Sequence, residues 1–141
     1  MWFQASAAQG NRRAMSCLSN IYSRGYGVKK DLKRAFELLE APADLGDPWA
    51  LCMLGWYAES GIIGNQDYEK AVTLYEQAIH AGDPHAHNNL GRLYWNGRGV
   101  IKNRRYGKKL IVKAAELGDE DAIALVGSMA KKNDPDWNRD D

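Results

Sequence analysis

Apolar residues recur along the chain with the spacing of one helix face, and the whole pattern repeats every 36 residues. The repeat is marked by Gly10, Gly46, Gly82 and Gly118. Small or apolar residues stand four, eight, eleven and twelve residues after each of these glycines. Residues with this spacing share one face of a helix. The pattern therefore predicts a first helix in every repeat. Its four apolar faces are Ala14, Leu18, Ile21 and Tyr22; Ala50, Leu54, Tyr57 and Ala58; Ala86, Leu90, Leu93 and Tyr94; and Ala122, Val126, Met129 and Ala130.

A second helix is predicted in each repeat, because a further group of small and apolar residues recurs at the same period. The three groups are Ala35, Leu38 and Leu39; Ala71, Leu74 and Tyr75; and Gly107, Leu110 and Ile111. Asp and Asn side chains stand where the helices should begin, and such side chains accept hydrogen bonds from free N–H groups of the first turn. These capping residues are Asn11, Asp47, Asp83 and Asp119 for the first helices, and Asp31, Asp67 and Asn103 for the second helices. The repeat glycines suit the left-handed position that ends the preceding helix.

Helix pairs of this kind bury their apolar faces only by stacking on one another. The sequence therefore predicts an all-α fold, a right-handed α/α superhelix (solenoid) of about three 36-residue helix-turn-helix repeats with half-repeats at both ends. One repeat domain is expected over residues 1–132, with full repeats at 10–45, 46–81 and 82–117 and partial repeats at 1–9 and 118–132. Residues 133–141 are expected to form a polar C-terminal tail.

Two positions depart from the repeat, and a tryptophan lies beyond its end. Pro42 stands late in a second helix, where proline removes a backbone donor, so we expect a kink or an early end of that helix. Ser19 replaces the glycine of its column, which predicts a slightly larger distance between its helix and the neighbouring one. Trp137 lies in the polar tail and could fold back over the helix that contains Ala122 and Val126.

Charge and cysteine content narrow the classes of function. The chain of 141 residues has 19 basic and 18 acidic side chains, a net charge of +1, and a hydrophobic fraction of 45%. This balance does not predict a nucleic-acid partner or a membrane surface as partner. Two cysteines cannot form a disulfide framework or a four-cysteine zinc site. The first residues lack the features of a secretory signal, so a cytoplasmic location is expected.

The motifs that most resemble catalytic or ligand-binding chemistry have simpler interpretations. The glycines of Arg24-Gly25-Tyr26-Gly27 and Gly97-Arg98-Gly99 recur at the turn between the two helices of a repeat, where glycine supplies a positive φ. His80, His85 and His87 are interpreted as surface side chains rather than metal ligands. Cys17 and Cys52 are interpreted as buried or half-buried structural thiols, since no base stands near either in the pattern. We therefore expect no catalytic residue, no metal, no cofactor and no enzymatic activity.

The repeat resembles a known family. Ala86-x3-Leu90-Gly91-x2-Tyr94-x2-Gly97-x-Gly99-Val100, followed by Asn103 and by Ala114-Ala115-x2-Gly118, is similar to the Sel-one-like repeat, a relative of the tetratricopeptide repeats. The unit from Ala14 to Gly46 repeats the match, and the middle unit departs from it at Ala58 and in the loop Gly61-Ile62-Ile63-Gly64. The resemblance covers about residues 2–130. It implies binding of protein partners, as an adaptor, a regulator or a bacterial immunity protein.

The resemblance to tetratricopeptide repeats also implies that the first helices line a concave groove. A second stripe on these helices is the candidate partner-binding surface. Its residues are Arg13, Ser16, Asn20, Trp49, Cys52, Trp56, Glu59, His85, Asn88, Arg92 and Trp95. The core columns are already filled, so the tryptophans exceed what packing requires, and tryptophan and arginine are enriched at binding hot spots. We expect Trp56, Trp95 and Arg92 to anchor a protein segment. The alternative is that the indoles wedge neighbouring first helices apart or cover the ends of the array.

Basic residues are concentrated in the third repeat. A candidate basic patch consists of Lys102, Arg104, Arg105, Lys108 and Lys109, in a segment that continues to Lys113 without an acidic residue. The simplest interpretation is a solvated helix face, and the functional one is a surface for an acidic protein. RNA is disfavoured because the tryptophans do not interleave with these charges.

The sequence thus predicts a non-catalytic module that binds a protein or peptide partner in its groove, as an adaptor, regulator or inhibitor. One alternative is a bacterial immunity protein that occludes a toxin or effector. An alternative of another class is an enzyme or small-ligand-binding protein that uses the His85/Arg92 end of the groove. A further alternative is a structural unit of a larger array, and Trp2 and Phe3 could seal a homodimer through the array ends.

Overall fold

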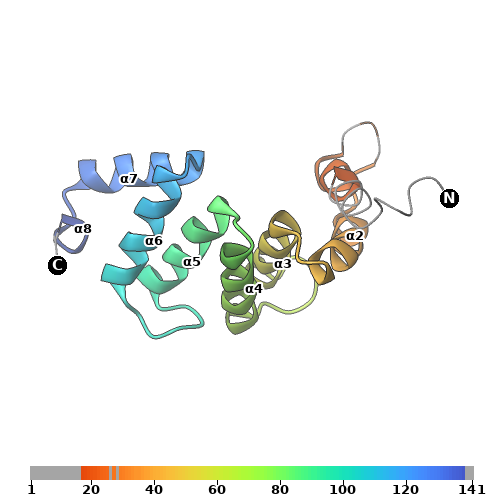
Figure 1. The fold of residues 1–141 in the computed structure, drawn as a ribbon, viewed down its shortest axis with the longest axis horizontal. Helices are drawn as coiled ribbons and strands as arrows, with labels where there is room; N and C mark the ends of the chain where they lie inside the picture. Colours follow the sequence, from red (N-terminus) through yellow and green to blue (C-terminus); the bar gives the residue numbers. More distant parts are fainter. Residues whose placement is uncertain (1–16, 26, 28, 139–141) are drawn as a thin grey trace.

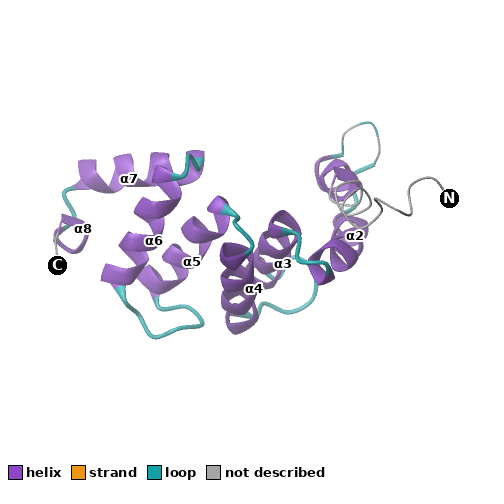
Figure 2. Cartoon of the chain, in the orientation of Figure 1, coloured by secondary structure: helices purple, strands orange, loops and turns teal. Residues whose placement is uncertain are grey.

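The chain folds as an elongated array of antiparallel helices (Figures 1 and 2). The computed structural model describes residues 17–25, 27 and 29–138, and within these residues there are helices and no strands. A helix that includes residues 17–24 comes first. The following helices are α2 (Leu32–Asp44), α3 (Pro48–Ser60), α4 (Tyr68–His80), α5 (Pro84–Asn96), α6 (Arg104–Glu116), α7 (Glu120–Lys132) and α8 (Pro135–Asn138). The prediction of an all-α repeat fold is confirmed.

Each helix packs on its neighbours in the sequence, so the array grows along one direction from α2 to α8 (Figure 1). The first helices α3, α5 and α7 begin at Pro48, Pro84 and Glu120, which are 36 residues apart. Contacts also join the first helices of consecutive repeats, α3 with α5 and α5 with α7. None of the described helices is long and apolar enough to cross a lipid bilayer.

The helix boundaries follow from the predicted caps. The carboxylates of Asp47, Asp83 and Asp119 accept hydrogen bonds from the backbone N–H groups three residues further on, at 2.8–2.9 Å. Asp31, Asp67 and Asn103 cap the second helices in the same way. The repeat glycines have positive φ values, 82° at Gly46, 99° at Gly82 and 94° at Gly118. They therefore occupy the left-handed position for which glycine has the smallest penalty. Asn11 and Gly10 lie outside the described residues.

Pro42 does not shorten its helix. Helix α2 has 13 residues, as α4 and α6 do, so the predicted early end is wrong. The physical reason is that Pro42 lies in the last turn of α2. Beyond it, the Leu45 N–H still donates to the Ala41 carbonyl (3.2 Å), and the Asp47 N–H donates to the Pro42 carbonyl (2.9 Å). The imino acid therefore costs the helix little, and its ring is buried in the core.

The two helices of a repeat approach most closely at the small-residue column. A Cβ atom added to Gly91 would lie 2.7 Å from the Gly107 carbonyl oxygen, so the backbones of α5 and α6 are in contact. Ser19 occupies the equivalent place in the first repeat and is buried. Its Oγ donates a 2.6 Å hydrogen bond to the carbonyl of Ala35, the repeat equivalent of Gly107. A short polar contact thus replaces the contact between glycines.

The buried side chains form two clusters. The larger one extends from α2 to α6 and includes Leu39, Tyr57, Tyr75 and Leu90, all nearly inaccessible to solvent. The smaller one joins Ile111, Ala114, Ala122 and Trp137 at the C-terminal end.

Trp137 corrects the expectation of a polar C-terminal tail. Residues 135–138 form the one-turn helix α8, and Trp137 is only 4% exposed. It shares the smaller core cluster with Ile111 and Ala114 of α6 and with Ala122 of α7, as expected for an indole that folds back over α7, and its ring packs on that of Trp95. The structure differs from this expectation at residues 135–138, because burying one large indole outweighs the polarity of its neighbours in the sequence. Residues 139–141 lie outside the described part.

Candidate functional site

The predicted groove residues Glu59 and Arg92 come from different repeats and meet between α3 and α5. The Arg92 guanidinium lies 3.8 Å from the Glu59 carboxylate. Arg92 Nη2 also donates to Asn89 Oδ1 at 2.8 Å, and the Tyr75 hydroxyl lies 3.5 Å from Glu59 Oε2. The Arg92 side chain remains 40% exposed. This arrangement holds a cation at the surface where two first helices meet.

Trp49 and Trp56 lie on α3 and are half-buried against the larger core cluster. The Trp56 ring makes an edge contact with Tyr57, with 5.2 Å between ring centroids. Glu59 follows Trp56 by three residues, so the indole and the Glu59–Arg92 pair share one face of α3. Each indole is therefore held in place by the core cluster on one side and is exposed to solvent on the other. Asn20 is half-buried as well, while Arg13 and Ser16 lie outside the described residues.

Cys52 and Asn88, two further groove predictions, are buried at 2% and 3% exposure. The Asn89 amide donates to Cys52 Sγ at 3.5 Å, which links α3 to α5. Burial, together with the nearby Asp83 carboxylate, raises the pKa of the Cys52 thiol far above its usual range. These two side chains are therefore inaccessible to a partner, because their column faces the first helix of the adjacent repeat. The expectation of a structural thiol is confirmed for Cys52 and wrong for Cys17, which is exposed.

Trp95 has a packing role in the structure. Its ring centroid lies 5.5 Å from that of Trp137, and the Arg104 guanidinium lies 4.9 Å from the Trp95 ring centre. Trp95 remains half-buried, as Trp56 does, so its role as a partner anchor stays a prediction. The contacts with Trp137 and Arg104 also agree with the second interpretation, an indole that covers an end of the array.

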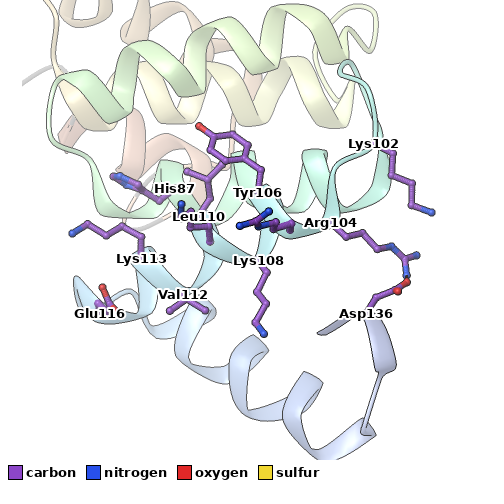
Figure 3. Close-up of a pocket in the computed structure, with 12 residues that line it drawn as sticks. His87, Lys102, Arg104, Tyr106, Lys108, Leu110, Val112, Lys113, Glu116 and Asp136 are labelled. Atoms are coloured by element: carbon purple, nitrogen blue, oxygen red, sulfur yellow. The ribbon is translucent and has the colours of Figure 1, made fainter. Parts of the chain in front are cut away.

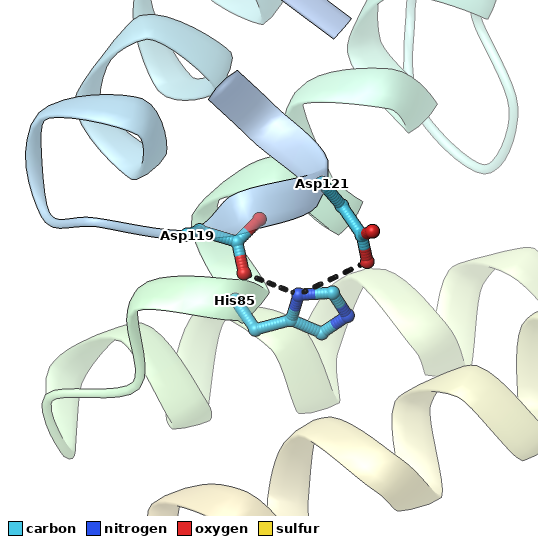
Figure 4. A group of neighbouring side chains, drawn as sticks. All are labelled: His85, Asp119 and Asp121. Atoms are coloured by element: carbon cyan, nitrogen blue, oxygen red, sulfur yellow. Dashed lines mark hydrogen bonds and ion pairs between the residues drawn. The ribbon is translucent and has the colours of Figure 1, made fainter. Parts of the chain in front are cut away.

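His85 connects α5 to the start of α7 (Figure 4). Its Nδ1 atom lies 2.7 Å from Asp119 Oδ1 and 4.0 Å from Asp121 Oδ2. The ligand atoms of the three residues lie within 4.8 Å of one another, and imidazole and carboxylates are the groups that bind divalent metals. Asp119, however, is also the N-cap of α7 and accepts from the Ala122 N–H. Hydrogen bonding between two repeats therefore accounts for this cluster.

The predicted basic patch divides into two groups of side chains. Arg104 pairs with Asp136, and Lys108 donates to the Trp137 carbonyl and lies over the Trp137 ring. These two cations hold α8 against α6. The exposed side chains are Lys102, Arg105 and Lys109. They line an open pocket of about 850 Å³ on α6, together with Lys113. Figure 3 shows Lys102 and Lys113 among the side chains around this pocket.

Sequence reasoning missed Asn89 and Asp136. Asn89 is a buried polar residue in a column that otherwise carries Cys17, Met53 and Leu125. A polar residue in this otherwise less polar column was the feature of the sequence that could have predicted a hydrogen bond between repeats. Asp136 had no comparable signal, because its role depends on how α8 packs.

Comparison with known proteins agrees with the geometry of the helices. The family model of the Sel1 repeat matches residues 1–11, 13–47, 50–83 and 84–119. A solved Sel1 repeat protein from Oxalobacter formigenes is 34% identical, with a TM-score of 0.70, and the match covers 88% of this chain and 94% of that one. The immunity protein Pa5087 from Pseudomonas aeruginosa is 26% identical, with a TM-score of 0.64, over 92% of this chain and 48% of its own.

A curated relative, an exopolysaccharide production negative regulator from Rhizobium leguminosarum bv. viciae, is 28% identical over 141 residues. The match covers 90% of this chain and 53% of the regulator. The chain thus spans about half the length of this regulator and of the immunity protein. Four consecutive matches to one repeat model, on a structure built from that repeat, identify the chain as a member of the Sel1 repeat family.

Proposed function

We propose that this chain is a non-catalytic protein-binding module whose partner contacts the face formed by α3 and α5. The observation that carries the proposal is the position of Trp56, which stays partly exposed one turn from the Glu59–Arg92 pair. Trp49 on the same helix extends this surface. Cys52 and Asn88, by contrast, are buried beneath this surface and do not contribute exposed atoms to it.

The energetic argument rests on the chemistry of these side chains. A half-buried indole is already fixed by its own packing, so it loses little conformational entropy when a partner covers it. Tryptophan and arginine are the residues most enriched among those that dominate binding energy. The larger core cluster is filled by Leu39, Tyr57, Tyr75 and Leu90, so the exposed part of Trp56 has no role in packing the repeat.

Relatives support a protein partner. One matched protein is named a negative regulator of exopolysaccharide production and another is named an immunity protein. Among such roles, the resemblance to the immunity protein favours inhibition by occlusion as the second candidate function. In that role the same face would cover a toxin or effector.

The test compares partner binding by wild type with that by a Trp56→Ala/Arg92→Ala double variant. Proteins captured from native lysate by the wild type are purified and titrated individually. We expect the double variant to lose affinity by about thirtyfold or more, since truncation of a hot-spot residue costs about 2 kcal/mol. Ile101→Ala is the control, because Ile101 is 92% exposed in a loop outside this face. Unchanged affinity of the double variant, with an intact circular-dichroism spectrum, would refute the proposal.

The inhibitory alternative has its own readout. Co-expression with a candidate toxin should restore growth when the wild type is supplied, and the double variant should fail to restore it. Equal rescue by both proteins would exclude this face as the inhibitory surface.

A further inference from the structure

Three cations form an exposed stripe along α6. Arg105, Lys109 and Lys113 stand four residues apart, so they share one face of the helix. With a rise of 1.5 Å per residue, the stripe spans about 12 Å. All three side chains are exposed, and within residues 29–138 no acidic group forms an ion pair with any of them. We call these three residues the α6 stripe.

The α6 stripe is specific to the third repeat. Its repeat equivalents are Glu69, Thr73 and Gln77 in α4, and Lys33, Glu37 and Ala41 in α2. An ordinary solvated face carries few charges or charges of both signs, as the faces of α4 and α2 do. Like charges four residues apart also destabilise a helix. The stripe therefore opposes helix stability, which suggests that its charges act on something outside the chain.

The α6 stripe borders the pocket on α6, and a further cation lines this pocket. The pocket on α6 is also lined by Lys102 and by apolar atoms of Leu110 and Val112 (Figure 3). Of its two acidic lining residues, Asp136 is already paired with Arg104, and Glu116 stands at the end of the helix. A ligand in this pocket therefore meets an excess of positive charge.

We propose that the α6 stripe binds an acidic segment of a protein, with carboxylates about 6 Å apart to match one helical turn. Arg105 presents a planar guanidinium that can hold a carboxylate with two parallel hydrogen bonds. The lysine stems and the apolar lining accommodate the aliphatic part of Glu side chains. The stripe lies on a second helix, so it is a surface separate from the face of α3 and α5 and does not depend on the function proposed above.

An acidic peptide fits this surface better than a nucleic acid does. Binding of single strands uses aromatic rings on which bases stack. Tyr106 is the aromatic residue that lines the pocket, and its ring makes an edge contact with Tyr94 at 4.7 Å between centroids. No tryptophan lines the pocket. Tyr106 is 40% exposed, but one ring does not provide the series of rings on which successive bases stack, so the stripe offers mainly charge and hydrogen-bond donors.

The test uses charge reversal with a matched control. The stripe variant is Arg105→Glu/Lys109→Glu/Lys113→Glu. The control variant, Lys29→Glu/Lys30→Glu/Lys33→Glu, changes the net charge by the same amount at exposed positions near α2, at the other end of the array (Figure 1). The probe is a fluorescein-labelled helical peptide with Glu at every fourth position, and its fluorescence anisotropy is followed at 150 mM salt. At that ionic strength the screening length is about 8 Å, so distant charges contribute little.

We expect the wild type and the control variant to bind the peptide equally within about twofold, and the stripe variant to lose about tenfold in affinity, as three exposed ion pairs would give. Three outcomes would overturn the proposal. The first is an equal loss in both variants, and the second is no loss in the stripe variant. The third is stripe-dependent binding of a single-stranded RNA or of phosphatidylserine vesicles without binding of the peptide. If the stripe variant does not fold, the Arg105→Gln/Lys109→Gln/Lys113→Gln variant replaces it, with a loss expected in the same direction.

Discussion

The interior repeats and the C-terminal end place equivalent residues in different environments. In the third repeat, Gly91 lets α5 touch the backbone of α6 at Gly107. The equivalent Gly127 on α7 has nothing within 4 Å of an added Cβ atom. Leu90 is fully buried, whereas its equivalent Val126 is only partly buried. A repeat position therefore specifies which face a residue occupies, and the neighbouring helix decides how tightly that residue is packed.

The C-terminal end also uses different chemistry to cover its apolar surface. The interior is closed by Ala, Leu and Tyr side chains that recur at the repeat period. At the end, Trp95 and Trp137 pack edge to face, and Arg104 and Lys108 lie over their rings. Aromatic and cation contacts of this kind add to the burial of the rings themselves. One aromatic residue from outside the repeat pattern thus provides much of the cover.

The largest expected difference between the two regions comes from adding one methyl group. Gly91→Ala should lower the free energy of unfolding by about 3 kcal/mol, because the new Cβ atom meets backbone and Ile111 atoms that cannot move aside easily. Gly127→Ala should raise it by about 0.5–1 kcal/mol, because alanine favours the helix and the space is open. Urea unfolding of both variants measures the difference. Similar effects at the two positions would contradict the comparison.

Removal of the indole at the end of the array should have an intermediate effect. Trp137→Ala should cost about 1.5 kcal/mol, the lower end for a large buried side chain, because α8 is one turn long and can detach without unfolding the repeats. The emission of Trp95 should shift to longer wavelength as its cover is lost. Ile123→Ala, at a 52% exposed position on α7, is the control and should change neither quantity appreciably.

The smallest expected effect concerns two equivalent helix caps. Burial raises the pKa of the Asp83 carboxyl, so the folded protein binds this proton more tightly than the unfolded chain does. The ionised carboxylate of Asp83 therefore lowers the free energy of unfolding at neutral pH. This destabilisation disappears as the pH falls below the pKa that the carboxyl has in the unfolded chain. Asp83→Asn keeps a capping oxygen and should raise the melting temperature at pH 7, with the gain shrinking toward pH 3.

The equivalent change at the C-terminal end should have the opposite sign. Asp119→Asn also keeps a capping oxygen, but it weakens the contact with His85 and should lower the melting temperature at pH 7. Thermal unfolding of both variants, followed by circular dichroism over this pH range, tests the contrast. The prediction for Asp83→Asn would be contradicted if its melting temperature rose relative to that of the wild type as the pH falls.

The features that sequence reasoning predicted correctly are local ones. Capping by Asp47 and Asp83, and helices that begin 36 residues apart, depend on interactions within a few residues or on a simple period. The features it missed depend on contacts between distant segments. Cys52 and Asn88 share a face with Trp49 and Trp56 in the pattern, but the adjacent first helix covers them. Helix α8 escaped prediction because Trp137 is stabilised by contacts with α5, α6 and α7, not by its own segment.

The close approach of α5 and α6 has a consequence for the shape of the molecule. Because their backbones touch, α5 and α6 cannot slide or tilt against each other without a collision, so we expect this pair to move as a unit. We expect bending on either side of this pair to occur at the flanking turns, at Gly82 and Gly118. Evolution could therefore adjust the curvature offered to another molecule by changing these turns alone, while every residue on the contact surface stays the same.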